Sequence, residues 1–162
     1  MRTRMAKTAS KLWRGRRGAA MLEFALVLWV LVLLAAGIWD LGRVYDAWLV
    51  ATNASREGAR WAARGEGLAA VQTRVANYIA TGTAGRSDVY FSSGEVTLVL
   101  DDGSGDPGDP VTVTVPVRVE LFMANVIPAV LRISEPCGAG GSATCLKVYG
   151  RETMRLQQAS AP

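Results

Sequence analysis

Twenty-one consecutive residues, Ala19–Trp39, contain a single charged side chain, the carboxylate of Glu23. An apolar stretch of about 20 residues is long enough to cross the hydrocarbon core of a bilayer as one helix. An acidic group at the centre of such a helix costs about 2.5–3.5 kcal/mol on insertion scales. The stretch therefore predicts a transmembrane helix over residues 19–39 and marks Glu23 as a candidate functional residue. The alternative reading of Glu23 is an acid that snorkels to the interface one turn away.

Basic charge is concentrated at the N-terminal end of the chain. Residues 1–18 hold seven of the eighteen basic residues and no acidic one, which leaves residues 19–162 with a net charge of −3. The isoelectric point of about 9.4 is therefore a property of residues 1–18, and it gives no support to nucleic-acid binding. Positive charge beside an apolar span keeps that end in the cytoplasm. We expect a basic cytoplasmic leader, residues 1–18, and translocation of everything beyond the span.

The helical pattern continues past the predicted span as far as Arg64, where Gly65 and Gly67 interrupt it. Spacings of three and four place on one face Leu41, Val44, Tyr45, Trp48, Leu49 and Thr52. Residues 40–64 are thus expected to form an amphipathic continuation of the membrane helix, laid against a soluble domain. The charged side chains of Arg56, Glu57, Arg60 and Arg64 are expected on a solvated face.

Gly58 is an exception within this amphipathic segment. A glycine inside a helix costs about 1 kcal/mol relative to alanine, so its presence predicts close backbone packing. We expect Gly58, Ala59 and Arg60 to form a helix-packing segment against the sheet, with an unselected break as the alternative.

Residues 65–162 are expected to form one extracytoplasmic domain. Helical spacing predicts a second helix over residues 68–79, and a period of two predicts strands over residues 96–100 and 111–121. Residues 145–156 are expected to form a last strand with an irregularity at Gly150. Pro116 lacks the amide hydrogen of a central ladder, so its strand is expected at an edge or with a bulge. The fold class is therefore α+β: a long N-terminal helix, half membrane-spanning and half amphipathic, packed on a small, mainly antiparallel sheet.

The only two cysteines, Cys137 and Cys145, flank a short glycine-rich loop, and the chain has no histidine with which they could complete a zinc site. In an exported domain such a pair predicts a disulfide, with two unpaired thiols as the alternative. The acidic segment Asp101–Asp109 offers oxygen ligands but lacks the spacing of an EF-hand, so a flexible turn is preferred to a calcium site.

Catalytic patterns are missing from the sequence. Without histidine there is no Ser-His or Cys-His pair and no His-ligated metal, and no phosphate-binding glycine loop occurs. We expect a non-enzyme with no cofactor, no metal and no small-molecule substrate.

The segment Gly18-Ala-Ala-Met-Leu-Glu23-Phe24 resembles the processing motif of class III prepilins, with glycine before the cut, glutamate at the fifth mature position and an aromatic residue after it. Asn53-Ala-Ser-Arg-Glu-Gly-Ala-Arg60 is similar to a recurrent stretch of the same family. The first 65 residues therefore look like a TadE-like minor pseudopilin of the tight-adherence (Flp) pilus system. A major subunit of such a fibre is a far shorter chain, so the appended domain argues for a minor role.

The resemblance implies cleavage by a prepilin peptidase between Gly18 and Ala19. The new amine of Ala19 would then pair with Glu23 of a neighbouring subunit and set the axial register of assembly. Implied partners are the membrane, the prepilin peptidase, other pilins and pseudopilins, and the Tad inner-membrane assembly platform. The implied location is the bacterial inner membrane, as a single-pass protein with a pilin-like domain in the periplasm or outside the cell. Whether the subunit sits at the pilus tip, primes assembly or stays in the membrane is left open by the resemblance.

Two other functions remain open from the sequence. One is an uncleaved single-pass anchor that displays a periplasmic binding domain. The other is a secreted protein whose signal peptide ends near Gly37, after the small residues Ala35 and Ala36.

Overall fold

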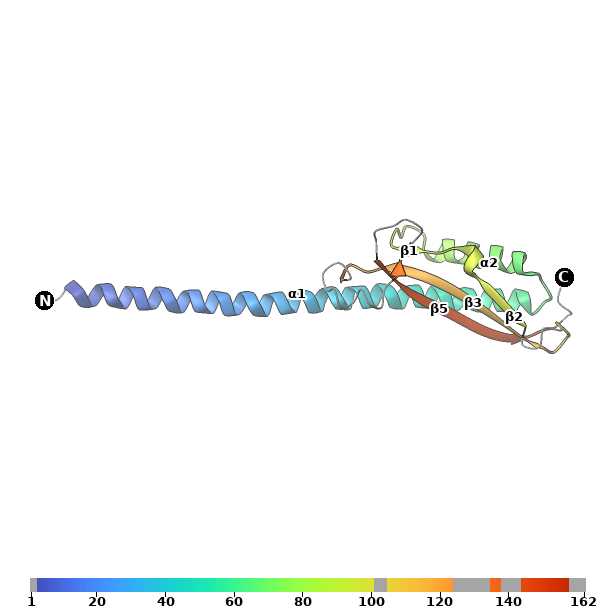
Figure 1. Ribbon diagram of the computed structural model, residues 1–162, viewed down its shortest axis with the longest axis horizontal. Helices are drawn as coiled ribbons and strands as arrows, with labels where there is room; N and C mark the ends of the chain where they lie inside the picture. The colour runs from blue at the N-terminus through green and yellow to red at the C-terminus, as the bar shows by residue number, and fades with distance from the viewer. Residues whose placement is uncertain (1–2, 101–104, 124–134, 138–143, 158–162) are drawn as a thin grey trace. The chain divides into compact units, whose positions relative to one another are not determined.

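The computed structural model describes residues 3–100, 105–123, 135–137 and 144–157, with side chains from residue 18 onward except that of Glu135 (Figure 1). The chain divides into two compact units, Met1–Trp39 and Asp40–Pro162. Helix α1 (Thr3–Ala62) contributes to both units. Each unit is therefore described by itself.

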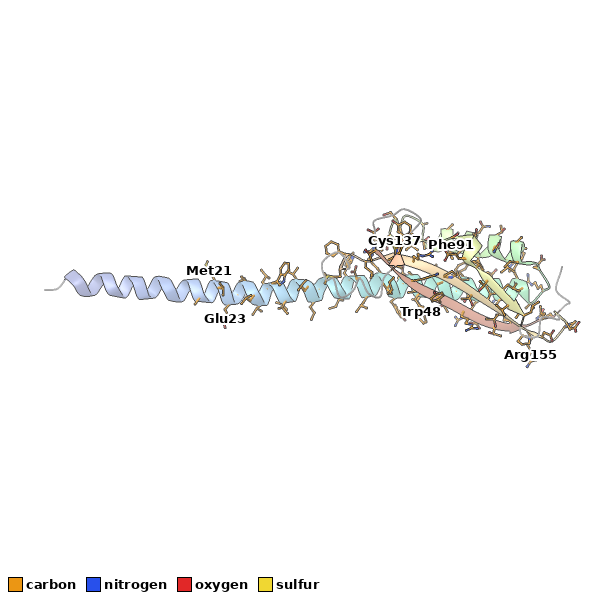
Figure 2. All side chains as sticks on the ribbon, viewed as in Figure 1. Met21, Glu23, Trp48, Phe91, Cys137 and Arg155 are labelled. Atoms are coloured by element: carbon orange, nitrogen blue, oxygen red, sulfur yellow. A yellow bond between two sulfur atoms is a disulfide. The ribbon has the colours of Figure 1, made fainter. Side chains whose placement is uncertain are left out.

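The first unit is the N-terminal part of α1. From Gly18 onward the helix is long and apolar enough to cross a bilayer, with a mean hydropathy of 2.5 over its most apolar window, and none of that window is buried. Figure 2 shows Met21 and Glu23 projecting outward from the helix. The side chains of Phe24 and Trp29 are also exposed, at 67% and 59% of their surface. Apolar side chains left uncovered by protein are compatible with a single-pass membrane anchor.

The second unit combines two helices with an antiparallel sheet. After α1 come α2 (Leu68–Gly82), β1 (Val89–Tyr90), the 3₁₀ turn η1 (Ser93–Glu95), β2 (Thr97–Leu100), β3 (Pro110–Glu120), β4 (Glu135–Pro136) and β5 (Thr144–Arg155). The sheet has the order β1-β3-β5-β4, and β2 also pairs with β3. Long helix and antiparallel sheet together confirm the α+β class expected from the sequence.

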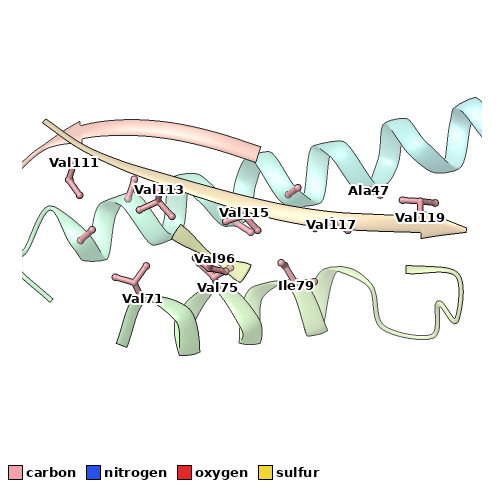
Figure 3. Close-up of a cluster of buried hydrophobic side chains, with 14 of the residues drawn as sticks. Ala47, Val71, Val75, Ile79, Val96, Val111, Val113, Val115, Val117 and Val119 are labelled. Carbon is pink, nitrogen blue, oxygen red and sulfur yellow. The ribbon is translucent and has the colours of Figure 1, made fainter. Parts of the chain in front are cut away.

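Alternation of valine and polar residues places the core on one face of β3. Five valines there are fully buried: Val111, Val113, Val115, Val117 and Val119. Figure 3 shows Val71, Val75 and Ile79 of α2 meeting this row. The continuation of α1 contributes small residues to the same cluster: Ala47, Ala51, Ala54, Ala59 and Ala62.

The prediction about which face of α1 is buried was largely wrong. Four of the large side chains expected on the buried face remain exposed: Leu41 at 70%, Tyr45 at 60%, Trp48 at 41% and Leu49 at 38%. Val44 does pack against the core. The reason is the short distance between α1 and β5: a Cβ added at Gly150 would lie 2.0 Å from the carbonyl oxygen of Ala51. Only alanine-sized residues fit at that separation.

Pro116 also differs from its prediction. β3 is an interior strand, and its register with β5 is continuous from Pro110–Arg155 to Glu120–Cys145, without a bulge. On the opposite side of β3, β2 pairs with residues 111–114 and β1 with residues 118–119. Position 116 thus falls in the gap between two short partner strands, where the missing amide hydrogen breaks no ladder bond.

The helix boundaries differ by a few residues from the sequence prediction. α1 ends at Ala62 rather than Arg64, and the turn that follows uses Gly65 with a φ of 86°. Glycine tolerates this left-handed conformation at no steric cost. α2 continues to Gly82, three residues beyond Ile79.

A disulfide joins Cys137 and Cys145, as the sequence predicts. Cys137 directly follows β4, and Cys145 lies in β5 opposite Glu135. The bond therefore fastens the short strand β4 to β5.

Candidate assembly segment

The predicted processing residues lie on uncovered helix. Ala19, Glu23 and Phe24 are exposed, and a Cβ added at Gly18 would meet no heavy atom within 4 Å. Within the part of the chain whose side chains are described, no hydrogen bond or ion pair reaches Glu23. Its carboxylate is therefore available to a group from another molecule.

Glu23 and Ala19 are four residues apart on α1, a rise of about 6 Å along the helix axis. Positions separated by four residues lie on one face of a helix. A neighbouring helix displaced by about one turn would thus bring its residue 19 level with this carboxylate.

At the start of the second unit, Asp40 is a buried carboxylate. It is 6% exposed and accepts hydrogen bonds from the backbone amides of Phe122, at 3.2 Å, and Met123, at 2.7 Å. These contacts tie α1 to the chain that leaves β3. No local sequence pattern marks Asp40, because its partners lie about eighty residues away.

Asp40 is one member of a network of ion pairs on the polar side of α1. Arg43 lies 3.5 Å from Asp40 and 2.9 Å from Asp88, which precedes β1. Arg86 bonds Asp88 at 2.6 Å and also pairs with Asp46 of α1. Hydrogen bonds from Arg86 and Arg43 hold the pKa of Asp88 well below its usual range, and Asp88 in turn raises the pKa of Arg86. The network fixes the loop before β1 against the helix.

The expected helix-packing segment divides into buried and exposed positions. A Cβ at Gly58 would lie 2.8 Å from Val75 Cγ2 and 3.1 Å from Val113 Cγ1. The absence of a side chain at Gly58 therefore lets both α2 and β3 pack closely against α1. Ala59 is fully buried. Arg60, in contrast, is exposed and pairs with Glu57 at 3.6 Å.

Glu57 connects α1 to α2 on this exposed side. Its Oε1 accepts hydrogen bonds from Arg74, at 2.9 and 3.0 Å, and from the indole of Trp61, at 3.3 Å. The hydrogen bond from Arg74 lowers the pKa of Glu57. Arg74 also lies over the Trp61 ring, 5.3 Å from its centroid. This surface is solvated, yet it carries specific contacts.

Metal ligation has no candidate among the residues that the structure describes, since no cluster of three or more His, Cys, Asp or Glu side chains occurs there. Residues 101–104 of the acidic segment lie outside the described residues. In the described remainder, Asp109 Oδ2 accepts a hydrogen bond from the amide of Asp106, at 2.8 Å, as in a tight turn.

Residues 18–60 match the TadE-like protein family. The match begins at Gly18 and ends at Arg60, so it includes both segments on which the sequence resemblance rests, and it confirms that resemblance. It lies within α1, and the sheet and α2 lie outside it. No curated protein and no solved structure matches the chain. Over these residues the chain is similar to TadE-like proteins, which suggests a Tad pilus-related membrane protein with an N-terminal apolar helix.

Proposed function

We propose that this chain is a minor pseudopilin, a structural and assembly subunit of a Tad (Flp) pilus. The observation that carries the proposal is the family match that starts at Gly18, five residues before an exposed acid in an otherwise apolar stretch of α1. The proposed topology has residues 1–18 in the cytoplasm, residues 19–39 in the inner membrane and residues 65–162 in the periplasm or outside the cell. Because disulfides persist in oxidising compartments, the bond between Cys137 and Cys145 supports this orientation.

Processing is proposed to occur after Gly18. A membrane peptidase must bring its catalytic groups close to the scissile backbone, and a residue without a side chain permits that approach. The cut releases an amine on Ala19 with a pKa of about 7.7–8.0 in model compounds, so the amine is mostly cationic near neutral pH.

The carboxylate of Glu23 is proposed to bind this amine from a neighbouring subunit. An unpaired charge in lipid is costly, and a salt bridge of good geometry offsets much of that cost. Because the two groups come from different molecules, the pair also fixes the axial offset between them. Glu23 would thus act as a register residue for assembly.

Helix contacts with other pilins are proposed to use the uncovered apolar side chains of α1. In the second unit this includes Leu41, Tyr45 and Trp48, and the rings of Tyr45 and Trp48 lie 5.7 Å apart. Other pilins, pseudopilins and the Tad inner-membrane platform are the proposed partners, and the prepilin peptidase is the processing enzyme.

The mature N-terminus tests this proposal. The full chain, expressed in membranes with a Tad prepilin peptidase, should begin at Ala19, and Gly18→Val should block the cut, whereas Gly15→Val should not. An unchanged Met1 start in the presence of active peptidase would support the uncleaved anchor instead. A soluble product that begins at Ile38 would support the secreted protein.

A further inference from the structure

Three arginine side chains line one surface pocket of the second unit. The pocket has a volume of 550 Å³ and lies where the end of α1 meets the end of β5. Figure 2 labels Arg155 at this end of β5. The described residues that line the pocket are Arg60, Ala63, Arg64, Met154, Arg155 and Gln157, none of them acidic. Among the described residues, the lining therefore includes three arginines and no acidic residue.

Two backbone hydrogen bonds and one side-chain hydrogen bond fix the elements that carry these arginines. The amide of Gln157 donates to the carbonyl of Ala63, at 2.7 Å, which joins the chain after β5 to the turn after α1. The amide of Leu156 donates to the carbonyl of Asp109, at 2.8 Å, and Arg155 Nη1 donates to the carbonyl of Gly108, at 3.1 Å. The pocket is thus held by three segments distant in sequence.

Neutralisation of these cations within the protein is incomplete. Arg60 lies 3.6 Å from Glu57, but that carboxylate already accepts two hydrogen bonds from Arg74. Arg64 lies against the Trp61 ring, 5.9 Å from its centroid. Across the described part of the second unit, no ion pair reaches either Arg64 or Arg155.

This positive site lies in a unit that is acidic as a whole. Residues 40–162 contain thirteen acidic and eleven basic residues. Like charges held close together repel one another, and the binding of an anion relieves that repulsion.

The carbonyl groups after α1 do not account for the arginines. Basic side chains near a helix C-terminus commonly bond the last carbonyls. Here backbone amides already fill that role: Arg64 N donates to Trp61 O at 3.1 Å, and Gly65 N donates to Ala62 O at 2.9 Å. The guanidinium of Arg64 is therefore not needed to bond these carbonyls, and Arg155 bonds the Gly108 carbonyl through Nη1 alone.

We propose that this pocket binds a phosphate group. Guanidinium presents a planar fork of N–H donors that matches the oxygens of phosphate and carboxylate. One guanidinium balances the single charge of a carboxylate, whereas a phosphate ester carries about 1.5–2 negative charges near neutral pH and so matches a cluster. The phosphate comes either from the free ion or from a phosphate-bearing polymer. This site belongs to the second unit and does not depend on a role in pilus assembly.

The test follows the arginine side chains themselves. The full chain, in neutral detergent micelles, is titrated with sodium phosphate at constant ionic strength while the Nε–Hε resonances of its arginines are recorded by NMR. Saturable shifts are expected for Arg64 and Arg155 but not for Arg151, which is exposed on β5 and does not line the pocket. Sodium chloride alone should not reproduce them.

Two variants sharpen this result. Arg64→Gln combined with Arg155→Gln should weaken phosphate binding about tenfold or more through the loss of charge-assisted hydrogen bonds, whereas Arg151→Gln should leave it unchanged. If the double variant fails to fold, the residue-resolved shifts of the unmodified chain still decide the question. Polyphosphate replaces the free ion in a second arm, and tighter binding per chain would identify a polymer as the source. Absence of saturable shifts with both probes, or equal shifts in the double variant, would overturn the proposal.

Discussion

Gly150 of β5 lies directly against the backbone of Ala51 in α1. A Cβ added at Gly150 would lie 2.0 Å from the carbonyl oxygen and 2.2 Å from the carbonyl carbon of Ala51. Non-bonded carbon atoms pack at about 3.5–4.0 Å, so no side chain fits between the two elements. The helix and the strand therefore meet through their main chains, and this contact sets the depth at which α1 lies on the sheet.

The substitution Gly150→Ala is expected to destabilise the second unit by about 3 kcal/mol or more, at or above the upper end of ordinary overpacking, because the obstructing atoms are backbone and cannot change rotamer. Urea unfolding of the full chain in micelles, followed by tryptophan fluorescence, measures this loss.

Gly94→Ala is the matched control, because a Cβ at Gly94 would meet nothing closer than Ser92 Oγ at 4.0 Å. Its unfolding midpoint should stay near that of the unmodified chain. Equal midpoints for Gly150→Ala and the unmodified chain would contradict the close contact of α1 with β5.

This contact also explains where sequence reasoning failed. Periodicity correctly predicted a helix through residues 40–62, but it assigned the buried face by size, to residues such as Tyr45 and Trp48. The structure buries Ala47, Ala51 and Ala54 instead, because main-chain contact at Gly150 leaves room only for small side chains. Hydrophobicity patterns carry no information about the distance between two elements, so this choice was not available from the sequence.

Other features also divide into those set by local sequence patterns, which could be predicted, and those set by pairings between distant segments, which could not. Strict alternation in residues 111–119 predicted the buried face of β3, since a period of two fixes which side chains share a face. The interior position of Pro116 depends on two short strands that leave a gap opposite it, and the role of Asp40 depends on amides of residues 122 and 123. Both arise from pairings between distant segments. The processing motif, in contrast, is local, and the sequence contained it entirely.

A double-mutant cycle is expected to show that Gly58 and Val75 are coupled. Gly58→Ala should lower stability by about 1–3 kcal/mol despite the better helix propensity of alanine, because the added methyl would lie 2.8 Å from Val75 Cγ2. In the background of Val75→Ala the same substitution should cost less, since the obstructing methyl is gone. Urea midpoints of the four chains give the coupling energy, and purely additive losses would contradict the contact.

Acid is expected to weaken the attachment of the loop before β1. Because Arg86 and Arg43 keep the folded pKa of Asp88 below its ordinary value, this carboxylate stabilises the fold at pH values above its unfolded pKa of about 3.9. That contribution is lost as the pH falls from about 4 toward the lower folded pKa. Glu57 and Glu95 shift in the same direction through Arg74 and Arg118. Urea unfolding between pH 7 and pH 3 measures the decline.

Asp88→Asn should reduce this pH dependence and should cost about 1–3 kcal/mol at pH 7, because Arg86 loses charged hydrogen-bond acceptors. Glu66→Gln serves as the control, since Glu66 is exposed and makes no ion pair within the described residues. A pH profile of Asp88→Asn that matches the unmodified chain would contradict a stabilising role for Asp88.

Loss of the disulfide is expected to release β4. This strand has two residues and pairs only with Cys145 and Thr144 of β5 within the described chain, so the covalent link is a large share of its attachment. Replacement of Cys137 and Cys145 by alanine should cost about 2 kcal/mol by loop-closure entropy. Hydrogen exchange should accelerate at residues 135–136 and stay slow at Val115. Unchanged exchange at residues 135–136 would show that β4 is held by other contacts.

The proposed pair of Glu23 with the Ala19 amine of a neighbouring subunit gives a prediction that separates assembly from processing. Glu23→Gln removes the negative charge and keeps the size of the side chain, so a cationic amine at Ala19 of a neighbouring subunit loses its partner. We expect co-purification with other pilins of the system to fall about tenfold or more, the loss that one charge-assisted contact confers when it is made in a medium of low dielectric. Pilus counts and the yield of cross-linked subunits measure it, alongside the fraction of chain that begins at Ala19.

Glu23→Asp refines this prediction, because it keeps the charge and shortens the side chain by one methylene. Partial recovery with aspartate would show that charge matters more than reach. Acetylation of the Ala19 amine after cleavage should reproduce the defect of Glu23→Gln, since it removes the other member of the same pair. If Glu23→Gln leaves pilus number, subunit cross-linking and leader removal all unchanged, the carboxylate is not a register residue, and its place in the apolar helix requires another explanation.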